Sequence, residues 1–96
     1  MIFDSLKSIR VIRLCEKYHV KTLSLFGSQL HGDSNAQSDI DLLVTFSKPM
    51  SLLQLVALER ELSDVLDARV DLVTEDSISP YIRKQILRER QQVYAA

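Results

Sequence analysis

Several residue types are scarce in this 96-residue chain, and each scarcity excludes a class of protein. A single cysteine cannot form an internal disulfide and is typical of a reducing compartment, so we expect a cytoplasmic location. One cysteine and two histidines also argue against a structural zinc site. No stretch approaches the roughly 20 apolar residues that a membrane helix requires. Residues 1–13 mix charged with apolar residues, so they do not have the pattern of a signal peptide. We therefore expect no membrane partner.

The chain also lacks a surplus of positive charge. Twelve basic and 13 acidic residues leave a formal net charge of −1, so the basic footprint typical of nucleic-acid-binding proteins is missing. Hydrophobic residues make up 46% of the chain, which is too many for an intrinsically disordered protein. We therefore expect one globular domain over residues 1–96. Because so short a chain buries a smaller share of its surface on folding than a longer one does, a second copy or another subunit would stabilise it.

Hydrophobic periodicity predicts an α/β fold. Helices are expected over residues 4–18, 51–67 and 79–91, and strands over 20–26, 39–46 and 68–74, with a short terminal strand at 93–94. Their order predicts a small mixed sheet of three to four strands packed by about three helices. The expected helix caps are Asp4 or Ser5, Ser51 and Ser79, the last followed by Pro80. The expected core positions on the helices are Leu6, Ile9, Ile12, Cys15, Leu52, Leu55, Leu58, Leu62, Leu66, Ile82, Ile86 and Leu87.

Two carboxylates interrupt the second predicted strand. Asp39 and Asp41 are two residues apart, so they project from one side of the strand, while Ile40 projects from the other. Like charges this close repel each other unless a cation lies between them. Asp71, in the third predicted strand, joins them if the two strands are neighbours. Oxygen ligands without histidine or cysteine favour Mg²⁺ or Mn²⁺. The alternative is solvent-facing aspartates on a sheet edge, although aspartate is depleted in strands.

A second polar feature follows the first predicted strand. Gly27 permits close approach of the backbone to a ligand, and Ser28 offers a hydroxyl and a backbone N–H. If a helical turn begins there, its free N–H groups form an anion site. A plain turn is the alternative reading. A phosphate site beside a metal site suits phosphoryl or nucleotidyl transfer, which depends on positioning and charge neutralisation.

These motifs resemble a known family. The segment LSLFGSQLHGDSNAQSDIDLLV is similar to the signature of the DNA polymerase beta nucleotidyltransferase superfamily: Gly-Ser, a spacer, then Asp-x-Asp. The ten-residue spacer resembles that of the minimal (MNT-type) nucleotidyltransferases. RVDLVTEDSISPYIRKQI resembles the strand of the third carboxylate and the helix after it. The resemblance covers residues 20–94 and implies a polymerase-beta-like nucleotidyltransferase fold.

The resemblance also implies roles for five residues. Gly27 and Ser28 would hold the triphosphate of ATP. Asp39 and Asp41 would bind two Mg²⁺ ions, while Asp71 would ligate one of them and help to activate the attacking hydroxyl. Many such proteins are antitoxins paired with a HEPN-type toxin, and some transfer AMP to a tyrosine of that toxin. We expect the same enzymatic activity here, with ATP as substrate.

One departure from the family pattern supports a second hypothesis. Gln29 and His31 stand where relatives often carry arginines, which lowers the positive charge near the triphosphate. Under this second hypothesis, the chain is a catalytically weak nucleotide-binding subunit, or an antitoxin that acts by complex formation alone. Lys48, Arg69 and Arg83 are candidates to supply the missing charge. Antibiotic adenylylation and nucleic-acid polymerisation are disfavoured, because related enzymes of those kinds generally carry an additional substrate domain.

Overall fold

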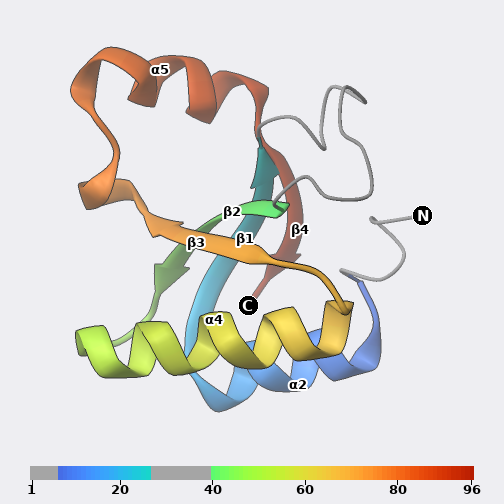
Figure 1. The fold of residues 1–96 in the computed structure, drawn as a ribbon. Coiled ribbons are helices and arrows are strands. Elements are labelled where there is room, and N and C mark those ends of the chain that lie inside the picture. Colours follow the sequence, from blue (N-terminus) through green and yellow to red (C-terminus); the bar gives the residue numbers. More distant parts are fainter. Residues whose placement is uncertain (1–6, 27–39) are drawn as a thin grey trace.

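The computed structural model describes residues 7–26 and 40–96 and has the predicted α/β architecture. Its described part contains three α-helices, a short 3₁₀ helix and a four-stranded mixed sheet (Figure 1). The elements in chain order are α2 (Ile9–Lys17), β1 (Val20–Phe26), β2 (Ile40–Phe46), α4 (Leu52–Leu66), β3 (Val70–Thr74), η1 (Glu75–Ser77), α5 (Pro80–Glu89) and β4 (Gln91–Ala95). The predicted strands are confirmed, and the terminal strand is longer than expected.

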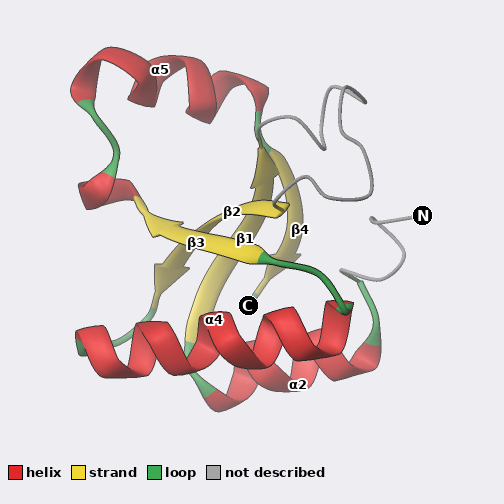
Figure 2. Ribbon diagram, in the orientation of Figure 1, coloured by secondary structure: helices red, strands yellow, loops and turns green. Residues whose placement is uncertain are grey.

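The sheet has the strand order β3-β2-β1-β4 (Figure 2). β1 is antiparallel to both β2 and β4, whereas β2 and β3 are parallel. Parallel neighbours require a crossover connection, and α4 provides it between β2 and β3. This crossover sets β2 and β3 side by side with their starting residues at the same end of the sheet.

The hydrophobic core lies between one face of the sheet and helices α2 and α4. Alternate strand residues fill it, so Leu42 is fully buried there while its neighbour Asp41 faces the other side of the sheet. Cys15 is also buried in this core, as predicted. Its burial raises the pKa of the thiol to about 12, so the sulfur stays protonated and serves in packing. None of the helices in residues 7–26 and 40–96 has the length and apolarity needed to cross a membrane.

Serine caps fix the helix starts. Ser51 caps α4 and forms a capping box with Gln54, and Ser79 caps α5 with Pro80 at its first turn, as predicted. The prediction that one helix spans residues 4–18 is wrong, because Ser8 is not helical. Ser8 has an extended backbone conformation, and its Oγ accepts a hydrogen bond from the Val11 N–H at 3.5 Å. Helix α2 therefore begins at Ile9, whereas Asp4, Ser5 and Leu6 lie outside the described residues.

Three predicted core residues are on the surface. Ile9 is 59% exposed, because α2 buries the face that carries Val11 and Cys15 instead. Leu52 is 74% exposed, because ten residues at about 100° each place it about 80° around the helix from buried Leu62. Ile82 is 49% exposed, since α5 buries none of its residues fully. Ile86 and Leu87, on the same helix, are half-buried.

The outer edge of β3 is closed by side chains. The N–H groups of Val70, Leu72 and Thr74 donate to Ser63 Oγ (3.2 Å), Glu59 Oε2 (2.9 Å) and Ser77 Oγ (3.2 Å) respectively. An edge strand with free N–H groups would be a template for pairing with another chain. Side chains from α4 and η1 instead satisfy these donors and hold the edge strand in place.

Glu59 is expected to contribute measurably to stability through this contact. Glu59→Ala leaves the N–H of buried Leu72 without its acceptor, so we expect a loss of about 1–2 kcal/mol in the free energy of unfolding. Glu59→Gln retains an oxygen that can accept the same hydrogen bond, and its loss should be smaller by about 1 kcal/mol. Urea unfolding of the two variants measures the difference, and equal losses would rule out the hydrogen bond as its cause.

Candidate active site

Two of the predicted site carboxylates are direct neighbours in the sheet. Asp41 on β2 pairs with Asp71 on β3 in the parallel register. The pairs on either side, Ile40 with Val70 and Leu42 with Leu72, are buried, so both aspartates project from the opposite face. Adjacent strands lie about 4.8 Å apart, which brings the two side chains within reach of one ligand. The predicted convergence of these two carboxylates is confirmed.

The environment of these carboxylates suits a cation with oxygen ligands. Asp41 is half-buried and Asp71 is exposed, so water reaches both. Two negative charges on neighbouring strands repel each other, and a bound cation relieves that repulsion. Carboxylates that leave room for water and phosphate oxygens match the coordination of Mg²⁺, and Mn²⁺ uses the same type of ligand.

Three predicted site residues, Gly27, Ser28 and Asp39, lie outside the described residues. The strands that flank them are described, however. β1 ends at Phe26, which pairs with Asp41 near the start of β2. β1 therefore ends, and β2 begins, beside the carboxylates. This supports the predicted link between the two motifs, and the roles of these three residues stay predictions.

A cavity of about 260 Å³ adjoins both aspartates. Apolar side chains form most of its remaining wall. They are Phe26 from β1, Val73 from β3, Ile78 from the connection between η1 and α5, and Ile82 and Ile86 from α5. The cavity was not predicted from the sequence, because Ile82 and Ile86 were expected in the core. Their four-residue spacing marks one face of α5, but nothing in the sequence showed that this face borders the carboxylates.

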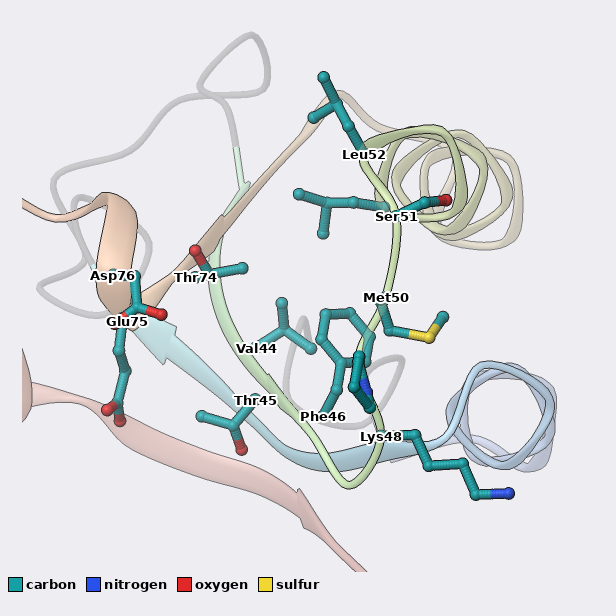
Figure 3. A pocket seen from close by; sticks show the side chains of 12 residues that line it. Val44, Thr45, Phe46, Lys48, Met50, Ser51, Leu52, Thr74, Glu75 and Asp76 are labelled. Atoms are coloured by element: carbon teal, nitrogen blue, oxygen red, sulfur yellow. The ribbon is translucent and has the colours of Figure 1, made fainter.

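The three candidate cations lie in different places. Lys48 follows the far end of β2, so it is at the opposite end of that strand from Asp41 (Figure 3). The Arg83 Nη2 donates to the Glu75 carbonyl at 2.6 Å and fastens α5 to η1. Arg69 directly precedes β3, and its carbonyl accepts from the Ile40 N–H at 2.9 Å. Of the three, only Arg69 belongs to the carboxylate end of the parallel pair.

A larger cavity of about 540 Å³ occupies the other end of β2 and β3. Thr45, Phe46, Thr74 and Glu75 line it together with the segment that leads into α4 (Figure 3). Lys48 lines this larger cavity, whereas the two described carboxylates, Asp41 and Asp71, do not. The smaller cavity beside Asp41 and Asp71 is therefore the candidate active site, although the other cavity is larger.

Comparison with known proteins gives relatives of one kind. "Putative protein adenylyltransferase MJ0126" from Methanocaldococcus jannaschii is 47% identical over 74 residues, which are 76% of this chain and 76% of that protein. "Protein adenylyltransferase MntA" from Thermococcus cleftensis is 37% identical over 86 residues, which are 90% of this chain and 87% of that protein.

Solved structures share the fold over nearly the whole chain. A toxin-antitoxin crystal structure with AMP-PNP matches with a TM-score of 0.75 and 27% identity, over 91% of this chain and 72% of that one. A complex of a tri-AMPylated HEPN toxin with its MNT antitoxin, from Shewanella oneidensis, matches with a TM-score of 0.68 and 25% identity, over 95% and 71%. The family description "Polymerase beta, Nucleotidyltransferase" matches residues 10–96. The chain therefore belongs to the polymerase beta nucleotidyltransferase family, as its motifs predicted.

Proposed function

We propose that this protein transfers AMP from ATP to a tyrosine hydroxyl of a HEPN-type partner toxin and so acts as its antitoxin. The observation that carries the proposal is the pairing of Asp41 with Asp71 beside a cavity at one end of the parallel strands. The names of the relatives support AMP transfer to a protein. The AMP-PNP complex and the AMPylated toxin support ATP as donor and a HEPN-type protein as acceptor.

The proposed chemistry assigns a task to each site residue. Bound Mg²⁺ would neutralise the triphosphate and stabilise charge in the transition state. Asp39, Asp41 and Asp71 would hold the two ions, and Gly27 with Ser28 would hold the triphosphate. The acceptor oxygen forms a bond to the α-phosphorus, and the bond from that phosphorus to the bridging oxygen of the β-phosphate breaks. Pyrophosphate leaves, and Asp71 takes up the proton of the hydroxyl.

Labelled ATP tests this proposal directly. The purified protein is incubated with Mg²⁺ and a lysate of its source organism, in parallel with α-labelled and γ-labelled ATP. We expect label on one protein band from α-labelled ATP only, because AMP transfer releases the γ-phosphate with pyrophosphate. Mass spectrometry of that band should locate AMP on a tyrosine. Label from γ-labelled ATP would indicate phosphorylation, and no label from either would contradict the transferase proposal.

The second candidate function is neutralisation by binding alone. Exposed apolar side chains favour it, because Leu53 and Tyr81 are 82% and 95% exposed and could contact a partner. Replacement of the usual loop arginines by Gln29 and His31 supports it as well. Co-expression of the toxin with the Asp41→Asn variant separates the two functions. Neutralisation by binding survives this substitution, whereas neutralisation by AMP transfer does not.

A further inference from the structure

The cavity beside the carboxylates is too small for a whole nucleotide. Pockets for small ligands usually measure about 300–1,000 Å³, whereas this one measures about 260 Å³. Its walls are also unsuited to a triphosphate, because burying charged groups against apolar side chains is costly. The cavity therefore matches a single side chain better than it matches ATP.

The cavity is mostly apolar, and its polar lining consists of the two strand carboxylates and the two serines before α5, Ser77 and Ser79. Phe26 and Val73 come from the strands, and Ile82 and Ile86 come from α5. Asp71, on β3, lines the same cavity. A phenol has the complementary polarity, since its ring is apolar and its hydroxyl forms hydrogen bonds. A serine or threonine side chain would reach the carboxylates but leave the apolar walls unfilled.

We propose that this cavity is the acceptor site and selects tyrosine over serine and threonine. The ring packs against Phe26, Ile82 and Ile86, and the hydroxyl is directed toward Asp71. This inference rests on the proposed function and adds to it the residues that determine acceptor specificity. The bond changes are those of AMP transfer: the phenolic oxygen joins the α-phosphorus, pyrophosphate leaves, and the phenolic proton passes to the Asp71 carboxylate.

Two features make the site accessible and fixed in shape. Ile82 is 49% exposed and follows the 95% exposed Tyr81, so a segment of another protein can reach the cavity from the surface. Two arginines connect the α5 region to Glu75 of η1. Arg83 donates to the Glu75 carbonyl at 2.6 Å, and Arg90 lies 3.5 Å from the Glu75 carboxylate. These contacts hold the isoleucines opposite the strand carboxylates.

Steady-state kinetics test the acceptor site. N-acetyl-tyrosinamide serves as the acceptor probe, with α-labelled ATP as donor. We expect Ile82→Ala to raise the KM for the probe about tenfold, because apolar contacts with the ring are lost, and to change the KM for ATP less than twofold. Val56→Ala is the matched control, since it truncates an exposed apolar side chain on α4 that does not line the cavity, and it should change neither constant. A rise in the KM for ATP alone would overturn the proposal and assign the cavity to the nucleotide.

A binding measurement separates this inference from the proposed function. Without ATP, N-acetyl-tyrosinamide and its phenylalanine analogue should both shift the NMR signals of the methyl groups of Ile82 and Ile86, and leave that of Ile12 on α2 unmoved. N-acetyl-serinamide should shift none of them. Shifts without any AMP transfer would support the cavity as a binding site for phenols and contradict the proposed transferase activity. AMP transfer to tyrosine without these shifts would reject the cavity as the acceptor site and retain the transferase.

Discussion

Replacing Asp41 by asparagine is expected to lower the rate of AMP transfer at least about 100-fold and to leave the fold intact. The substitution keeps the shape of the side chain but removes one of the two adjacent charges at the start of the parallel strands. Metal-assisted charge stabilisation contributes several kcal/mol to such reactions, and each 1.36 kcal/mol is a tenfold change in rate. Asparagine matches aspartate in size, keeps one acceptor oxygen and relieves the repulsion from the neighbouring carboxylate, so the sheet should stay folded.

Initial rates with α-labelled ATP and Mg²⁺ measure this effect. Asp64→Asn is the matched control, because it makes the same chemical change at an exposed position on α4 and should retain the full rate. Urea unfolding of both variants shows whether the protein remains folded. A folded Asp41→Asn protein with the wild-type rate would remove Asp41 from the active site and leave the proposed mechanism without its best-defined residue.

Much of this site follows from local sequence rules. Alternation along a strand predicted that Asp41 faces away from the core while Ile40 and Leu42 enter it, and the structure confirms this. Serine before an apolar helical pattern predicted Ser51 and Ser79 as caps, and both are confirmed. These features depend on residues within a few positions of each other, which is why the sequence alone was sufficient.

Features that depend on distant segments were less predictable. The pairing of Asp41 with Asp71 was conditional on β2 and β3 being neighbours, and nothing local to either strand establishes that. The exposure of Ile82 depends on how closely α5 packs on the rest of the protein. Helical periodicity carries no information on that packing, so it placed Ile82 in the core. The cavity beside the carboxylates combines both of these features. It could therefore be recognised only once the strands and α5 were placed together.

The residues behind the carboxylates support the site from the other face of the sheet. Leu62 of α4 is fully buried in the core that also contains Leu42 and Leu72, the strand neighbours of Asp41 and Asp71. Leu62→Ala should lower the free energy of unfolding by about 2–5 kcal/mol, because the smaller side chain leaves a cavity. For a domain of this size, such a loss lowers the Tm by at least about 10 °C.

Leu53 provides the matched comparison on the same helix. It is 82% exposed, so Leu53→Ala should change the free energy of unfolding by no more than about 0.5 kcal/mol. Thermal and urea unfolding of the two variants measure this contrast. At temperatures where Leu62→Ala is still folded, its AMP transfer should persist, since Leu62 supports the strands without facing the carboxylates. Equal losses in the free energy of unfolding for the two leucines would mean that α4 does not pack on the sheet through Leu62. The strands that carry Asp41 and Asp71 would then be stabilised by other residues.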